Sequence, residues 1–262
     1  MKLKQLICLL ATLMFAETAM AQIYERTPRE YDFALSDIAK RIIPVLSFNQ
    51  NMHNDSWIWK EGRSSALVEK GKPSDFYEIN KINDLDMELG ENDISTAWVE
   101  GVQGDGIGEW VIIPVTVNDD ELEDMLNNGK SDGKLDIHFF ICNGFQKNQD
   151  LYLKNNRIKE AKITIYAAAY SCGQDDAFLL WNPDSIYEQT ITLNDEIIFN
   201  PICLNLHSET FSVTLPEKYR KEHCELYLKL EIRSVYKGSK YNDTCISDMA
   251  ATAAAPEEGP DI

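Results

Sequence analysis

Hydrophobic and polar residues alternate with a period of two along several stretches of the chain. The clearest is 225–236, ELYLKLEIRSVY, in which every second residue from Leu226 to Ile232 is Leu or Ile. Similar alternation occurs at 160–166 and 210–215. Because successive side chains of a strand point to opposite faces, this pattern predicts strands with one buried face.

Two continuous apolar runs, EWVIIPV at 109–115 and IHFFIC at 137–142, predict central, well-buried strands. Pro114 cannot donate a ladder hydrogen bond, so the first run is expected at a sheet edge or at a bulge. Polar turns rich in Asn, Asp and Gly separate the runs, which is typical of a β-sandwich or jelly roll. One amphipathic helix is predicted at 36–46.

The two ends of the chain differ from its middle. Residues 1–21 combine Lys2 and Lys4, a short apolar run and an Ala-Met-Ala site, which is the pattern of a secretory signal peptide. We therefore expect an exported protein, periplasmic or extracellular. No later stretch approaches the roughly 20 apolar residues that a membrane-spanning helix needs. The C-terminal residues 250–262, rich in Ala, Pro and Glu, are predicted to be a disordered tail.

The net charge of −18 disfavours nucleic acid and anionic membranes as partners, because both repel an acidic surface. Of the six cysteines, Cys8 lies in the predicted signal peptide, and the odd set that remains leaves at least one thiol unpaired or bonded to another molecule. The chain has no CxxC motif, so these cysteines do not predict a fold-defining disulfide framework. They are Cys142, Cys172, Cys203, Cys224 and Cys245.

Catalytic signals are weak. The histidines His53, His138, His207 and His223 lack metal-ligand spacing, and no nucleophile-elbow motif occurs. Cys142 lies inside a predicted strand, where a buried, unreactive thiol is expected. A glycosidase needs only two facing carboxylates, and nothing singles out such a pair. A module without catalysis is therefore predicted, with a hydrolase as the weaker alternative.

A glycine-rich stretch, GVQGDGIG, spans 101–108 and contains Gly101, Gly104, Gly106 and Gly108. A phosphate-binding glycine loop follows a strand and opens a helix, whereas this one runs into the predicted strand at 109–115. Phosphate binding is therefore excluded, and a structural loop and a ligand-binding loop both remain open.

Three segments carry a family resemblance: 93–115, 143–165 and 235–249. The strings TAWVEG, GDGIGEW and YKGSKYNDT within them resemble the NAD-glycohydrolase-type glycan-binding (translocation) domain, which is related to discoidin and coagulation-factor type C domains. The resemblance implies an all-β jelly-roll β-sandwich with a galactose-binding-like fold over 62–249, whose first and last strands are adjacent. It also implies glycan binding rather than NAD chemistry.

Two regions fall outside the family pattern. Residues 167–201 are longer than the pattern and are treated as an insertion. Residues 22–61 form a short N-terminal extension that contains the predicted helix.

The resemblance and the polar composition of 146–157 and 236–243 together predict a glycan-binding site. A sugar needs hydrogen-bonding side chains for its hydroxyls and an aromatic ring for its apolar face. The expected partner is a glycan or cell-surface polysaccharide, and the alternative is a protein-interaction or structural module without a sugar site. The predicted contacts are Glu100, Lys147, Tyr152, Asn155, Asn156, Arg157, Tyr241, Asn242 and Asp243, with the four glycines of 101–108 shaping a wall.

The resemblance further implies a structural calcium ion, because related jelly rolls often bind one in the loop before the Trp. The oxygen donors would be Glu91, Asp93, Thr96 and Asp248. Glu91-Asn92 replaces the family's Asp-Gly, so a turn network made by the same residues remains the alternative. Trp98 and Trp110 are both expected to be buried, Trp110 more firmly.

Overall fold

The computed structural model describes residues 62–82, 93–117, 132–172, 178–197, 203–220 and 224–255. The predicted signal peptide, the predicted helix at 36–46 and Glu91 lie outside these residues.

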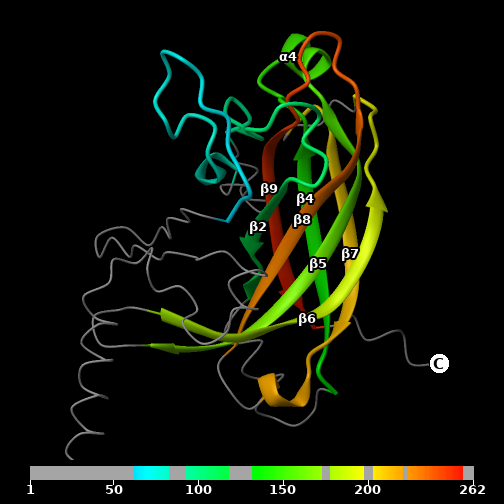
Figure 1. Ribbon diagram of the computed structural model, residues 1–262. Coiled ribbons are helices and arrows are strands. Elements are labelled where there is room, and N and C mark those ends of the chain that lie inside the picture. The colour runs from blue at the N-terminus through cyan, green and yellow to red at the C-terminus, as the bar shows by residue number, and fades with distance from the viewer. Residues whose placement is uncertain are drawn as a thin grey trace, which may run out of the picture.

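The described strands form two sheets (Figure 1). The first sheet has the order β1 (Trp98–Val99), β9 (Cys245–Ala254), β4 (Lys134–Asn143), β7 (Leu206–Thr214), and β3 (Thr116–Val117) also pairs with β9. The second has the order β2 (Trp110–Pro114), β8 (Cys224–Tyr236), β5 (Arg157–Cys172), β6 (Phe178–Thr192). The described part of the chain also has three short helices: η2 (Ile79–Lys81) before β1, α4 (Gln149–Lys154) between β4 and β5, and η3 (Glu217–Arg220) between β7 and β8.

The all-β sandwich predicted from the sequence is confirmed. All pairs of described strands are antiparallel except β3 with β9. The first strand β1 pairs with the last strand β9 through Trp98 and Ile246, so the two ends of the domain are adjacent as expected.

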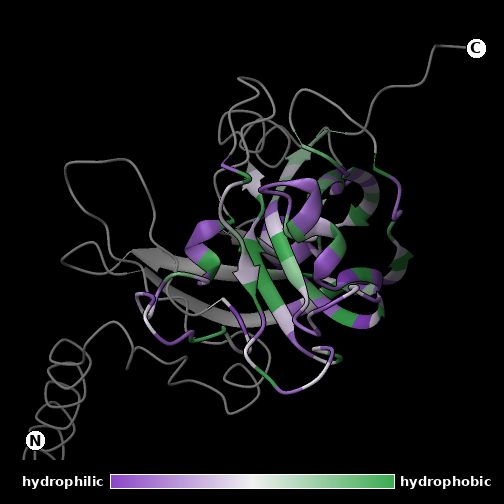
Figure 2. Ribbon diagram, turned by 90° about the horizontal axis from the view of Figure 1, so that it is seen from above, coloured by the Kyte–Doolittle hydropathy of each residue, from purple (hydrophilic) through white to green (hydrophobic). Residues whose placement is uncertain are grey.

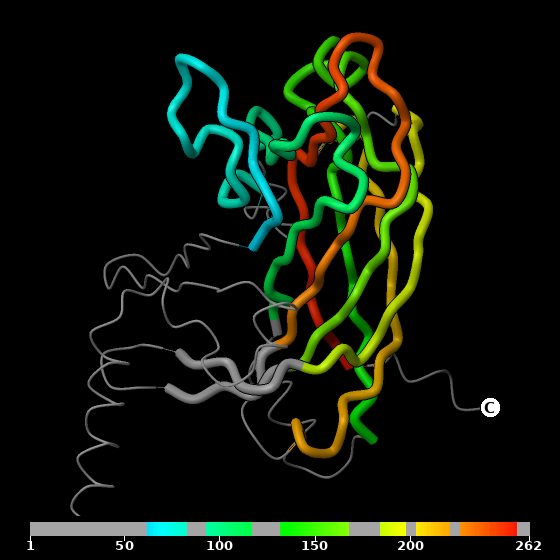
Figure 3. Tube along the Cα trace, in the orientation of Figure 1, coloured from blue at the N-terminus to red at the C-terminus, as the bar shows by residue number. Residues whose placement is uncertain are grey.

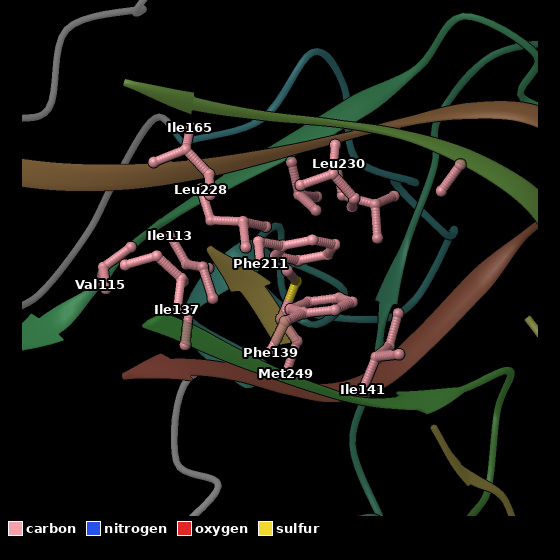
Figure 4. Close-up of a cluster of buried hydrophobic side chains, with 14 of the residues drawn as sticks. Ile113, Val115, Ile137, Phe139, Ile141, Ile165, Phe211, Leu228, Leu230 and Met249 are labelled. Carbon is pink, nitrogen blue, oxygen red and sulfur yellow. The ribbon is translucent and has the colours of Figure 1, made fainter. Parts of the chain in front are cut away.

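The core lies between the two sheets and follows from the alternation in the sequence. The apolar positions of β8 from Leu226 to Ile232 are fully buried, and β4 alternates buried and half-exposed residues up to Phe140. Figure 2 shows the same alternation of hydrophobic and hydrophilic residues along the strands. Side chains from both sheets meet in the middle (Figure 4), including Ile113, Ile137, Phe139, Ile165, Phe211, Leu228, Leu230 and Met249.

The strand formed from the first apolar run is at a sheet edge, as Pro114 predicted. β2 is the outermost strand of its sheet, where a residue without an N–H is tolerated. The two tryptophans differ. Trp98 is fully buried, whereas Trp110 is only half-buried beneath the Lys229 ammonium, 4.9 Å from its ring centre. Trp110 is therefore the more exposed of the two, because it alternates with the core residues Val111 and Ile113 and so lies on the outer face of its strand.

Most of the predicted insertion at 167–201 continues a hairpin rather than forming a separate unit. β5 and β6 pair from Glu160 with Thr192 to Cys172 with Phe178. β5 is 16 residues long, which corresponds to roughly 50 Å of strand. The hairpin therefore extends toward the end of the sandwich opposite Arg157 (Figure 1).

The C-terminal tail was predicted to begin at residue 250, which is too early. β9 continues to Ala254, pairing with β4 on one side and with β3 on the other. Ala251 and Ala253 are buried, while Thr252 between them is exposed. The alanines alternate with period two, and their small side chains fit against the core, so residues 250–254 belong to the sandwich.

Candidate functional site

Four segments meet at one end of the sandwich, called here the loop end: 62–82, the glycine loop 101–108, the α4 segment 146–156 and the C-terminal loop 237–244 (Figure 3). The α4 segment and the C-terminal loop touch through their backbones. The N–H groups of Ser239 and Tyr241 donate to Leu153 O and Lys154 O at 2.9 and 2.8 Å. The structure thus brings together the two polar segments that sequence analysis combined into one site.

Helix α4 was not predicted. Asn148 caps it, its side chain accepting from Leu151 N at 2.9 Å, and Asp150 and Lys154 sit at the ends where the helix dipole favours their charges. With only six residues, the helix is too short to show a clear periodic pattern.

The glycine loop is joined to the C-terminal loop through Asp105. Its carboxylate pairs with Lys237, and its carbonyl accepts from Thr244 Oγ1 at 2.8 Å. The amide of Asn156 also donates to Asp105 Oδ1 at 3.5 Å. The glycine loop therefore lies directly beside the two polar segments and contacts both of them.

Three of the four glycines in this loop adopt a backbone conformation that favours glycine. Gly104, Gly106 and Gly108 have positive φ. Gly106 also lies directly over Glu100, and a Cβ at this position would come within 2.6 Å of Glu100 Cγ. At Gly101, a Cβ would come within 2.4 Å of Ala66 O, which ties the loop closely to the 62–82 segment.

Glu100 is buried under the glycine loop and stabilises it. Its side chain is fully buried and accepts from Val102 N at 2.8 Å and from Thr244 N at 3.3 Å. Burial raises the pKa of Glu100 to about 7, and nearby Asp243 adds to the rise, although the two N–H donors oppose it. The predicted direct contact of Glu100 with a ligand is therefore not available, because the loop covers the carboxylate.

Arg157 is likewise an internal support. Its Nε and Nη2 donate to the two oxygens of Asp195 at 2.8 and 2.7 Å, and its Nη1 donates to Asn155 O at 2.9 Å. The Arg157 side chain is 7% exposed and that of Asp195 26%. Burial alone would lower the pKa of Arg157, but its hydrogen bonds and attraction to Asp195 outweigh burial and raise it.

Tyr152 extends the same network. Its hydroxyl donates to Asp195 Oδ1 at 3.0 Å and accepts from Asn205 Nδ2 at 2.8 Å, and its ring lies 5.1 Å from the Arg157 guanidinium. Burial raises the pKa of Tyr152 to about 12. The ring is 1% exposed and so cannot stack on a sugar.

Two asparagines connect the polar segments. Asn155 Nδ2 donates to Leu151 O at 2.8 Å at the end of α4. Asn156 Nδ2 donates to Asn242 O, and its Oδ1 accepts from Gly238 N at 2.8 Å. Both residues are buried, so they position the loops instead of facing a ligand.

The remaining predicted contacts lie at the surface. Tyr241 is 37% exposed, with the Lys240 ammonium 4.8 Å from its ring centre. Lys147 and Asn242 are exposed, and Asp243 is half-exposed, with a pKa raised by partial burial. The surface available to a ligand is therefore narrower than predicted: five of the nine residues are buried beneath it.

Several residues that support the site were not predicted from the sequence. Asp195 follows β6 within the predicted insertion, and no motif marks it. Gly238 is needed because a Cβ there would lie 2.3 Å from Lys154 O, and its place in the YKGSKYNDT string was an available signal. Gln146 accepts from Leu204 N at 2.7 Å and donates to Asn205 O at 2.7 Å.

Asp93 and Thr96, two of the residues predicted to bind calcium, form a turn network. Asp93 Oδ1 accepts from Ser95 N at 3.0 Å, and Thr96 Oγ1 donates to Lys81 O at 2.9 Å. Asp248 is fully buried and accepts from Met249 N at 2.8 Å. Among the described residues, no three His, Cys, Asp or Glu side chains are grouped to hold a metal ion. The turn network left open as the alternative therefore describes Asp93 and Thr96.

No helix in the described part of the chain is both long enough and apolar enough to cross a lipid bilayer.

Comparison with known proteins gives one match. The family described as NAD glycohydrolase translocation F5/8 type C domain matches residues 59–252, more than half of the chain. No curated protein and no solved structure matches.

Proposed function

Because the chain belongs to the family of NAD glycohydrolase translocation F5/8 type C domains, we propose that it is an exported, noncatalytic glycan-binding module. The proposed export rests on the signal-peptide pattern of residues 1–21. The proposed ligand is a glycan or cell-surface polysaccharide that contacts the C-terminal loop 237–244 of the loop end.

One observation carries the proposal: a rigid polar network supports a surface aromatic ring. The C-terminal loop presents Tyr241, Asn242 and Asp243, and its backbone is fixed to α4 by the hydrogen bonds of Ser239 and Tyr241. A ring with adjacent amide and carboxylate groups can pack on the apolar face of a sugar and hydrogen-bond its hydroxyls. Pre-organised loops reduce the entropy lost on binding.

The test begins with a glycan array probed with the purified chain. The affinity for the best glycan is then measured for Tyr241→Ala, with thermal unfolding as the check on folding. We expect the affinity to fall about tenfold or more, which corresponds to at least about 1.4 kcal/mol, while the melting temperature stays unchanged.

Phe76→Ala is the matched control. Phe76 is 36% exposed, close to Tyr241 in exposure, and lies in the separate 62–82 segment. Its removal should leave the affinity unchanged. An array without a hit, or a folded Tyr241→Ala protein with full affinity, would overturn the proposal.

The glycine loop favours a protein partner as the second candidate. Val102 is 40% exposed and Ile107 54%, and exposed apolar side chains on a rigid loop are common in protein interfaces. If this candidate is correct, the double variant Val102→Ser, Ile107→Ser no longer binds a protein partner that the wild type binds. Glycan arrays then show no ligand for the wild type or for the variant.

A further inference from the structure

Two cysteines that are far apart in the sequence meet beneath the loop end. Cys142 is near the end of β4, where Leu206 of β7 is its register partner. Cys203 lies three residues before Leu206 along the chain. Both side chains are buried, at 0% and 3% exposure.

The two thiols are close enough to form a hydrogen bond. Cys142 hydrogen-bonds to the sulfur of Cys203, and this bond, together with the Asn205 N–H, lowers the pKa of Cys203 despite its burial. Cys245 is the opposite case: burial and nearby carboxylates raise the pKa of its thiol. Cys203 is therefore the thiol more easily converted to the thiolate that attacks a disulfide.

We propose that Cys142 and Cys203 form a disulfide bond when the chain folds in an oxidising environment. Thiols that already hydrogen-bond to each other need little backbone movement to reach disulfide geometry. The bond belongs in the oxidising compartment to which the proposed export leads, but its chemistry depends neither on export nor on glycan binding.

The oxidation balances with a disulfide such as oxidised glutathione. While the chain folds and its thiols are still accessible, the Cys203 thiolate attacks one sulfur of glutathione disulfide, forming a mixed disulfide and releasing one glutathione thiolate. Cys142 then loses its proton and attacks the Cys203 sulfur, releasing the second. The two protein thiols lose two electrons and two protons, and one glutathione disulfide becomes two glutathione molecules.

The bond would strengthen the support of the loop end. The residues after Cys203 are held by Gln146, whose Oε1 accepts from Leu204 N and Asn205 N at 2.7 and 3.2 Å. Asn205 in turn donates to the Tyr152 hydroxyl. A link from Cys203 to β4 would therefore fix the connection before β7 to the network that carries the α4 segment.

The experiment uses the purified full chain, reduced and unfolded, then refolded in a mixture of reduced and oxidised glutathione. After thiol blocking, cleavage on the carboxyl side of acidic residues places Cys142 in fragment 137–150 and Cys203 in fragment 197–209, apart from Cys172. We expect mass spectrometry to find these two fragments joined, and a reductant to separate them.

The second measurement is thermal unfolding with and without reductant. A cross-link closing a loop of about 60 residues should raise the melting temperature by about 10 °C. Cys142→Ala and Cys203→Ala should each lose this difference, and the matched control Cys245→Ala should keep it. Fragments that are not joined, or a difference that persists in both variants, would overturn the proposal.

Discussion

Arg157 allows a direct test of whether the predicted contact residues bind a ligand or support the loops. Replacing Arg157 with Met keeps the aliphatic length and removes the guanidinium, leaving Asp195 without its two Arg donors and Asn155 O without one. Breaking a buried ion pair by removing one partner costs about 3–5 kcal/mol. Because the Asp195 side chain is 26% exposed and keeps the Tyr152 hydroxyl, we expect the lower end, about 3 kcal/mol.

The assay is denaturant unfolding at pH 7, with Lys154→Met as the control. Lys154 forms a surface pair with Asp150 one helical turn away, and such pairs contribute about 0.3–0.5 kcal/mol. The double variant Arg157→Met, Asp195→Asn should cost less than the sum of the two single changes, because the pair acts as a unit.

The opposite result would refute this reasoning. If Arg157→Met unfolds within about 0.5 kcal/mol of the wild type, a range typical of surface substitutions, and the variant no longer binds its glycan, Arg157 contacts the ligand directly. Its hydrogen bonds to Asp195 would then have to open when the ligand binds.

Two further predictions concern the same end of the sandwich. Trp98→Ala should destabilise the protein by about 3–5 kcal/mol in denaturant unfolding, because it empties a fully buried site and frees Ser65 O, which accepts from the indole at 2.9 Å; near-wild-type stability would contradict this. Because the pKa of Glu100 is raised, the folded state binds the Glu100 proton more tightly than the unfolded state does. Protonated Glu100 therefore contributes to the free energy of unfolding in full below about pH 4.5, and this contribution is lost as the pH rises to about 7. That contribution is about 3 kcal/mol. The Glu100→Gln variant should therefore not show the fall in stability between about pH 4.5 and 7 that the wild type shows. If the variant shows the same fall, Glu100 is not its source.

The sequence determined the sheets because strand alternation depends only on the order of neighbouring side chains. Leu226 through Ile232 face the core as their spacing predicted, and Pro114 correctly placed its strand at an edge. The glycine loop was also readable, since positive φ and close backbone contacts require glycine regardless of the ligand.

Whether each polar side chain is buried or exposed was decided by the tertiary structure. Arg157 and Glu100 have the donors and charges of contact residues, and nothing near them in the sequence shows that they are buried. Arg157 is buried because Asp195, 38 residues away, satisfies it, and Glu100 because the Thr244 N–H, 144 residues away, reaches its carboxylate. A buried polar group is stable only with partners, and these partners meet only when the two sheets close and bring the loops together at one end.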